Sequence, residues 1–121
     1  MKRLLIADDD RMFVELVRAL LPSSSWQVSV ANDSMQVMMF AMRTPAPEAI
    51  LLDINMPGGT GLSALQRLKQ SAKTALIPVV VVSGAQDSML PDQVRMLGAK
   101  GFIAKPVNAQ TFESELLRLI E

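Results

Sequence analysis

Short apolar runs alternate with segments of helical periodicity along the whole chain. Runs rich in aliphatic and β-branched residues are typical of buried strands, whereas apolar residues spaced by three and four positions are typical of helices. Regular alternation of the two indicates βα units, a parallel sheet and helices that cover both of its faces. We predict strands near residues 3–8, 26–31, 48–53, 78–83 and 101–104, and helices near residues 11–21, 34–43, 61–70, 91–97 and 108–120.

Single residues mark the starts of several elements. Asp10 precedes the first helix and is a favoured N-cap, so we expect its charge to be structural rather than metal-binding. Pro91 is favoured in a first helical turn, so the fourth helix is expected to begin near it. Trp26 starts the second strand, and we therefore expect it at the edge of the sheet where the parallel strands begin.

The second predicted helix is rich in methionine. Four methionines recur at helical spacing and predict one core-facing stripe, with Val37 and Phe40 on the other side of the helix. The alternative is a methionine-rich surface for a partner, since methionine adapts to varied contacts. The four residues are Met35, Met38, Met39 and Met42.

Acidic residues follow two of the predicted strands. Asp8 and Asp9 come directly after the first strand. Asp53 ends the third strand, because the proline and glycines that follow it cannot continue a strand. In open parallel α/β sheets, ligands bind outside the carboxyl ends of the strands, where the strand order reverses. If the two strands are neighbours, their carboxylates converge and require a cation, and oxygen ligands suit Mg²⁺ or Ca²⁺ rather than zinc.

Two further polar side chains are expected at the same edge. The fourth strand ends in Ser83 and the fifth is followed by Lys105. Four strands of the predicted sheet thus each deliver a polar or charged group to this edge. Together these groups describe a site built from carboxylates, a hydroxyl and a cation.

The amino-acid composition limits the kinds of reaction that are possible at that site. The chain has 121 residues, of which 50% are hydrophobic and 20% charged, as expected for one globular domain over residues 1–121. It contains no histidine and no cysteine, which excludes classical catalytic triads and zinc hydrolase sites. The formal net charge is zero, so we expect no direct nucleic-acid binding. Asp8 ends the first apolar run far too early for a signal peptide or a membrane span, and we expect a soluble cytoplasmic protein.

The remaining nucleophile is a carboxylate, and carboxylates attack phosphorus in aspartyl-phosphate chemistry. Phosphoryl transfer needs positioning and charge neutralisation more than acid–base groups. We therefore interpret Asp53 as a phosphoacceptor in a Mg²⁺ site, with Lys105 and Ser83 assisting. Asp9 would bind the metal directly, Asp8 partly through water, and the backbone carbonyl of Asn55 would complete the protein ligands.

These motifs, in this order, resemble the receiver domain of bacterial two-component response regulators, and the resemblance covers essentially the whole chain. Residues 6–10 are similar to the acidic pair after the first strand. Residues 52–57, with Gly61 eight positions after the aspartate, are similar to the phosphoacceptor loop. Residues 82–84 resemble the strand that ends in serine or threonine, and residues 98–106 resemble the segment with the switch aromatic residue and the lysine.

The resemblance implies a flavodoxin-like (βα)5 fold, a doubly wound sandwich around a parallel sheet of order 2-1-3-4-5. It implies that a sensor histidine kinase or a histidine phosphotransfer protein donates the phosphoryl group. Ser83 and Phe102 would form the switch, which acts on an effector domain or protein through the fourth helix, fifth strand and fifth helix. The resemblance also suggests a cis Lys105–Pro106 bond.

Three other functions fit the sequence less well. A receiver-like interaction module without phosphorylation is disfavoured because every expected site residue is present. A phosphatase with an aspartate nucleophile would want an acid two positions after Asp53, where Asn55 stands. A flavin-binding protein would want a hydroxyl-rich phosphate loop where residues 8–10 are acidic.

Overall fold

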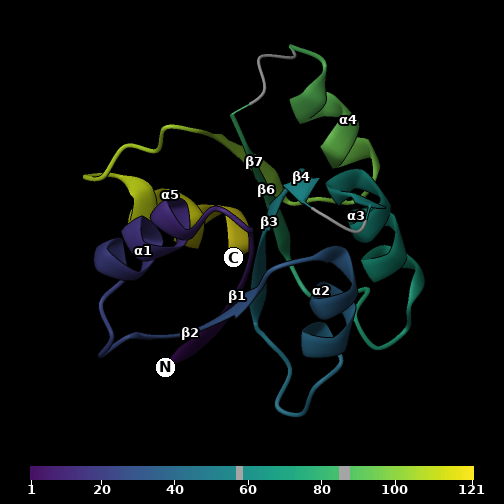
Figure 1. The fold of residues 1–121 in the computed structure, drawn as a ribbon, viewed down its shortest axis with the longest axis horizontal. Helices are drawn as coiled ribbons and strands as arrows, with labels where there is room; N and C mark the ends of the chain where they lie inside the picture. The colour runs from purple at the N-terminus through teal and green to yellow at the C-terminus, as the bar shows by residue number, and fades with distance from the viewer. Residues whose placement is uncertain (57–58, 85–87) are drawn as a thin grey trace.

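The computed structural model of the chain describes residues 1–56, 59–84 and 88–121. Its centre is a parallel sheet of five strands (Figure 1). The strand order is the predicted 2-1-3-4-5, because the fourth and fifth strands of this sheet carry the labels β6 and β7. The flavodoxin-like fold is therefore confirmed. In spatial order the strands are β2 (Trp26–Ala31), β1 (Lys2–Ala7), β3 (Ala49–Asp53), β6 (Val79–Ser83) and β7 (Gly101–Ala104).

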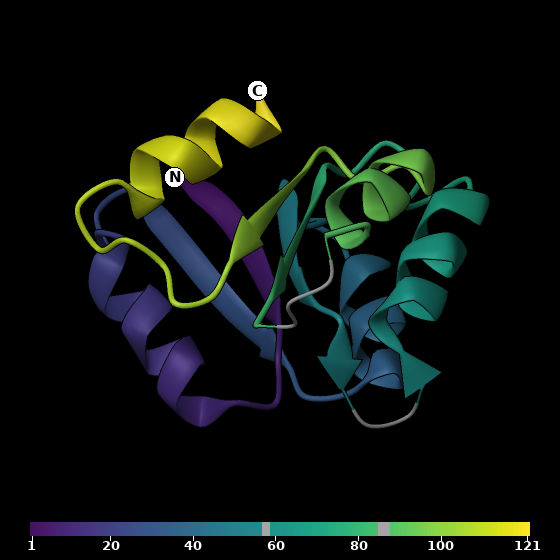
Figure 2. The same ribbon diagram turned by 90° about the horizontal axis from the view of Figure 1, so that it is seen from above.

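Helices cover both faces of the sheet and enclose two hydrophobic cores (Figure 2). Along β1, Leu5 and Ala7 face one core while Leu4 and Ile6 face the other, since successive side chains on a strand point to opposite faces. The first core is closed by α2 (Ser34–Ala41), α3 (Gly61–Gln70) and α4 (Leu90–Met96), and the second by α1 (Arg11–Leu20) and α5 (Phe112–Ile120). None of the helices in the described ranges is long and apolar enough to cross a membrane.

Helix starts follow the predicted signals, with one exception. The side chain of Asp10 accepts hydrogen bonds from the backbone of Met12 and Phe13, at 3.0 and 3.3 Å, and so caps α1 as predicted. Helix α4 starts at Leu90, with Pro91 in its first turn. The prediction of a fifth helix from residue 108 is wrong, because α5 starts only at Phe112.

The late start of α5 has a local cause. The side chain of Asn108 accepts a hydrogen bond from the Gln110 backbone at 2.9 Å, and the backbone carbonyl of Asn108 accepts one from the Thr111 backbone at 3.2 Å. An asparagine side chain that bonds to the backbone two residues later favours a turn over a helix. This turn occupies the residues that the helical pattern assigned to the first turn of α5.

The prediction of a core-facing methionine stripe on α2 is also wrong. The buried side of α2 is formed by Ser34, Val37 and Ala41, with Met38 packed partly against the core. These small side chains let the helix approach the sheet closely. The other three methionines of the stripe face solvent: Met35 is 69% exposed, Met39 56% and Met42 44%.

A short antiparallel hairpin of β4 (Asn55–Met56) and β5 (Gly59–Thr60) connects β3 to α3. The next residue, Gly61, donates a backbone hydrogen bond to the Ile54 carbonyl at 2.7 Å. A Cβ atom on Gly61 would lie 2.5 Å from the Asp53 carbonyl oxygen and from the Ile54 Cα. Only glycine therefore fits where this connection returns past the end of β3.

Trp26 lies at the start of β2, where it pairs in register with Lys2 at the start of β1. It is buried, and its indole nitrogen donates a hydrogen bond of 2.8 Å to Glu113 in the first turn of α5. The opposite end of the same strand pair is Ala31 beside Ala7. The expectation that the tryptophan lies at the amino-terminal edge of the strands is confirmed.

Candidate functional site

The register of the two central strands brings their acidic residues together. Ala7 of β1 pairs with Leu52 of β3, so Asp8 and Asp53 are the next residues on neighbouring strands. The carboxylates of Asp8, Asp9 and Asp53 each offer an oxygen within 4.8 Å of the others. Asp8 is 1% and Asp53 5% exposed, whereas Asp9 faces solvent. The two strands thus deliver two buried carboxylates and one accessible carboxylate to a single point, as the sequence predicted.

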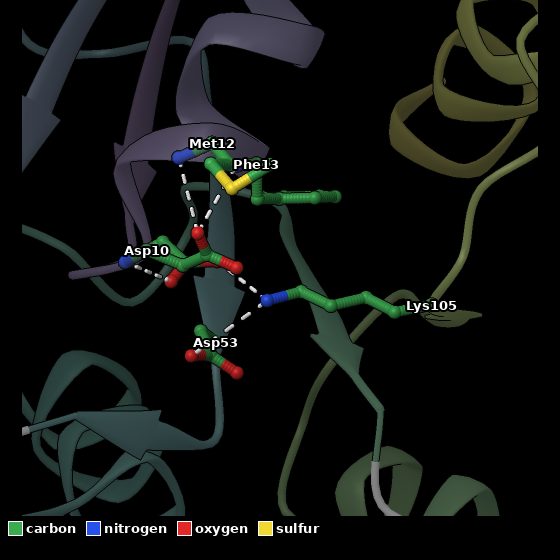
Figure 3. A network of polar contacts seen from close by, with 6 residues as sticks. Asp10, Met12, Phe13, Asp53 and Lys105 are labelled. Carbon is green, nitrogen blue, oxygen red and sulfur yellow. Dashed lines mark hydrogen bonds and ion pairs between the residues drawn. The ribbon is translucent and has the colours of Figure 1, made fainter.

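Lys105, which follows β7, reaches across to this cluster (Figure 3). Its Nζ atom lies 2.9 Å from Asp8 Oδ2 and 4.0 Å from Asp53 Oδ2. The same nitrogen lies 4.3 Å from the centroid of the Phe13 ring, a distance typical of a cation–π contact. The ammonium therefore bridges the two buried carboxylates and is closer to Asp8. Its ion pair with Asp53 is the longer of the two contacts.

The shape of the cluster is held by backbone groups as well. Asp8 Oδ1 accepts a hydrogen bond from the Asp10 backbone at 2.9 Å, while Oδ2 accepts the one from Lys105. Both oxygens of Asp8 are thus partnered within the protein. Asp10 uses its own carboxylate for the α1 cap and stays outside the cluster, as expected.

The electrostatic environment of Asp53 disfavours its negative charge. Burial is the main cause and the neighbouring Asp8 carboxylate the second, and together they raise the pKa of Asp53 to about 6. Lys105 and a hydrogen bond from the Asn55 backbone act in the opposite direction but do not cancel them. A carboxylate in this state gains from any cation that binds beside it.

The other predicted site residues lie at the same edge of the sheet, except Phe102, which pairs with Val81 two residues before the end of β6. Ser83 is the buried last residue of β6, one position beyond Val82, which pairs with Asp53. Phe102 lies on β7, is partly buried and packs against the core under α2, α3 and α4. Asn55 starts β4, two residues after Asp53. The bond between Lys105 and Pro106 is cis, as the resemblance suggested, and the Thr44–Pro45 bond is also cis.

The donor atoms of this cluster fit a divalent cation of the magnesium type. Among the described residues, the cluster offers three carboxylates and no nitrogen or sulfur ligand, and hard oxygen donors are what Mg²⁺ prefers. One ammonium is too little to balance the charge of three carboxylates, so the site retains negative charge for a metal. The exposed position of Asp9 leaves the cluster accessible from solvent.

The structural roles of two contributors to the site could not be read from the sequence. Phe13 fitted the apolar pattern of α1, and its contact with Lys105 joins elements far apart in the chain. Gly61 was noted for its spacing from Asp53, but its lack of a side chain proves to be required by backbone packing against the strand that carries Asp53. Such contacts depend on tertiary structure, which residue spacing does not reveal.

Comparison with known proteins agrees with the architecture. Residues 4–117 match the family model of the response regulator receiver domain. Protein PilH of Pseudomonas aeruginosa is 32% identical over 111 residues, which cover 92% of this chain and 91% of PilH. The response regulator PleD of Caulobacter vibrioides is 34% identical over 108 residues, which cover 88% of this chain and 23% of PleD. This chain thus spans about a quarter of the length of PleD.

The fold also matches solved structures. The chemotaxis response regulator CheY4 of Vibrio cholerae has a TM-score of 0.88 at 23% identity, over 98% of both chains. The family match extends over nearly the whole of the described sheet and its helices. The chain therefore belongs to the receiver domains of two-component response regulators, which are signalling switches operated by phosphorylation.

Proposed function

We propose that Asp53 is the phosphoacceptor of this receiver domain. The supporting observation is the position of its carboxylate, which is buried on a central strand, beside Asp8 and Asp9 and 4.0 Å from Lys105 Nζ. The phosphodonor is a phosphohistidine on a sensor histidine kinase or a histidine phosphotransfer protein. An oxygen of Asp53 forms the new O–P bond as the P–N bond of the donor breaks, and the electron pair of that bond stays on the imidazole nitrogen.

We assign Mg²⁺ to the carboxylate cluster. Asp9 would hold it directly, Asp8 partly through water, and Asp53 together with the Asn55 backbone carbonyl would complete the protein ligands. When bound, Mg²⁺ neutralises phosphoryl oxygens and orients the group for in-line attack. The chain's own contribution is a fixed set of oxygen atoms at the ends of two buried strands.

Lys105 neutralises the charge that the phosphoryl group brings. Its ammonium already lies within 4.0 Å of both buried carboxylates, so a small shift of its long side chain carries it from Asp8 toward a phosphoryl group on Asp53. The hydroxyl of Ser83, from the neighbouring strand, then donates to a phosphoryl oxygen. Charge-assisted contacts of this kind are about twice as strong as neutral hydrogen bonds.

The output follows from the position of Phe102 on an edge strand. As Ser83 moves toward the phosphoryl group, the aromatic ring moves into the space that the hydroxyl leaves. Helix α4 covers the face of the sheet on which this ring packs, and α5 covers the other face. Together with β7, these helices would present the changed surface to an effector domain or protein in the cytoplasm. The chain acts only on its own aspartyl phosphate, which it gains from a donor and loses by hydrolysis.

Intact-mass measurement after incubation with acetyl phosphate and Mg²⁺ tests the assignment. The wild-type chain should gain one phosphoryl group, and Asp53→Asn should gain none. Asp92→Asn, which changes an exposed carboxylate on α4, is the matched control and should be phosphorylated normally. A phosphoryl group that survives in Asp53→Asn, on Ser83 or Thr60, would refute the role of Asp53.

A further inference from the structure

The outer side of α2 carries a continuous ridge of methionine. Met35, Met39 and Met42 follow the spacing i, i+4 and i+7, which places them along one side of a helix. They are 69%, 56% and 44% exposed, while Val37 and Ala41 close the core on the opposite side. The helix is therefore apolar on both sides, although a surface helix normally shows solvent a polar side.

The two ends of this ridge have opposite charge. Asp33 caps the start of α2, and Arg43 follows its end, so that the acid and the base lie equally far from Met38 at the middle. The Arg43 guanidinium lies 3.9 Å from the centroid of the Phe40 ring, which keeps it beside the helix. Along the helix, an acidic residue is followed by the methionines and then by a basic residue. A second copy of the helix that runs in the opposite direction would therefore place its base against the acid and its acid against the base.

A hollow beside the methionine ridge would accommodate the start of α2 from the second copy. It has a volume of about 400 Å³ and opens to solvent next to Met42. Two cations, Arg43 and Lys73, lie in its wall, and its remaining lining residues are Ala41, Thr44 and Ala46. The first turn of α2 from an antiparallel second copy would place its Asp33 beside these cations and its Met35 beside Met42.

We propose that α2 is a homodimer surface on which two copies of this chain pair antiparallel about a two-fold axis near Met39. Met35 of each copy packs on Met42 of the other, and Asp33 of each faces Arg43 and Lys73 of the other. The same patch serves both copies, as a two-fold interface requires. Antiparallel packing also places opposite ends of the helix dipoles side by side.

Three properties of the chain favour a second copy as the occupant. Its formal net charge is zero, so two copies do not repel one another at long range. Methionine side chains adapt to each other when one ridge meets another. The interface also covers the β2 side of the sheet, while α4 and β7 lie toward the opposite edge and stay exposed for an effector. Because each subunit contributes one helix of eight residues, the dimer is weak and depends on concentration.

Sedimentation equilibrium measures the association directly. The average mass of the wild-type chain should rise above 13.2 kDa with concentration, toward twice that value. Met39→Glu puts a charge on the two-fold axis and should weaken association at least about tenfold, which corresponds to about 1.4 kcal/mol. Met12→Glu changes an 84% exposed methionine on α1 and should associate like the wild type. A wild-type chain that stays monomeric up to about 1 mM overturns the proposal.

Cross-linking tests the direction of the helices, and it is simple because the chain has no cysteine of its own. A short bismaleimide should link Met39→Cys to itself across the axis. It should link a mixture of Met35→Cys and Met42→Cys far more than either variant alone, with one variant isotopically labelled so that mixed dimers are identified by mass. Preferential linking of Met35→Cys to itself would indicate parallel helices and overturn the proposed pairing. Circular dichroism of each variant verifies that the fold is retained.

Discussion

The Nζ atom of Lys105 lies 2.9 Å from Asp8 but 4.0 Å from Asp53. The ammonium therefore neutralises chiefly Asp8, and Asp53, the proposed phosphoacceptor, receives only the longer contact. Burial and the neighbouring Asp8 carboxylate raise the pKa of Asp53, and the longer contact with Lys105 offsets them only in part, since the attraction between charges falls with distance. The strength of this ion pair thus influences both metal binding and the charge of the nucleophile.

Stability without metal should fall as pH rises through the titration of Asp53. The folded-state pKa of about 6 exceeds the usual value of 3.8, so between these values the folded protein holds a proton that the unfolded chain has lost. The favourable contribution is complete below about pH 4 and is lost as pH rises through about 6. The total is about 3 kcal/mol, at 1.36 kcal/mol per pKa unit.

Asp53→Asn isolates this effect in urea unfolding with EDTA present. The variant should be more stable than the wild type by up to about 3 kcal/mol at pH 8, and the difference should shrink toward pH 4. Asp92→Asn should show no such trend, because that carboxylate is exposed. A constant difference between Asp53→Asn and the wild type at all pH values would contradict the raised pKa.

Asp9→Ala should remove Mg²⁺ binding and leave the fold intact. Asp9 is the exposed member of the carboxylate cluster, so its removal opens no cavity in the core. The loss of a negative charge also relieves repulsion, and the metal-free variant should melt at a higher temperature than the wild type. Calorimetric titration should detect no binding at Mg²⁺ concentrations that saturate the wild type.

The neighbouring Asp10→Asn is the matched control for this experiment, because asparagine can still cap α1 while the carboxylate is lost. It should bind Mg²⁺ like the wild type. Equal Mg²⁺ affinity in Asp9→Ala and the wild type would disprove the ligand role of Asp9.

Trp26 fluorescence should change little when Mg²⁺ binds. Trp26 of β2 pairs with Lys2 at the start of β1, whereas Asp8 follows the last residue of β1. At roughly 3.3 Å per residue along β1, Asp8 therefore lies about 20 Å from the tryptophan. A metal at the cluster therefore makes no contact with the indole. Quenching by Mg²⁺ that disappears in Asp9→Ala would place the metal site elsewhere. Mg²⁺ titration of the wild type and this variant, followed at the tryptophan emission, checks the expectation.

Gly61→Ala should destabilise the protein by roughly 3 kcal/mol, at the upper end of the usual cost of overpacking. The new methyl group would meet backbone atoms of residues 53 and 54 at 2.5 Å, and no change of rotamer can relieve such a contact. Gly84→Ala is the control, because among the described residues the nearest atom to its Cβ would be 3.8 Å away, on the Lys105 side chain. Urea unfolding of both variants measures the difference, and equal stability would contradict the close approach at Gly61.

The sequence predicted the sheet and the position of the site well, because both depend on patterns that are local in the chain. A buried strand that ends in a carboxylate is visible as a run of residues, and the rule for parallel sheets places such ends at one edge. Asp8, Asp53, Ser83 and Lys105 all lie there as expected. The choice of Asp8 as the main partner of Lys105 depends on a difference of about an ångström, which no pattern encodes.

The orientation of α2 could not be predicted for a different reason. Apolar residues lie on most sides of this helix, so periodicity distinguished no single buried side. Packing decided the orientation, since Val37 and Ala41 allow a closer approach to the sheet than three methionines would. The start of α5 was similarly decided by the side chain of Asn108, whose bond to the backbone outweighed the helical pattern.

Strands β1 and β3 are buried on both faces, and this burial determines which residues of the site can move. Four consecutive residues of β1 and all five of β3 are buried, and each strand has a partner on either side. The carboxylates at their ends therefore form a stationary frame. Lys105 follows β7, which is paired on one side only in the part of the sheet that the structure describes. When the charge of these carboxylates changes, movement of this outer strand costs the least free energy. A local chemical change thereby alters the surface of the molecule.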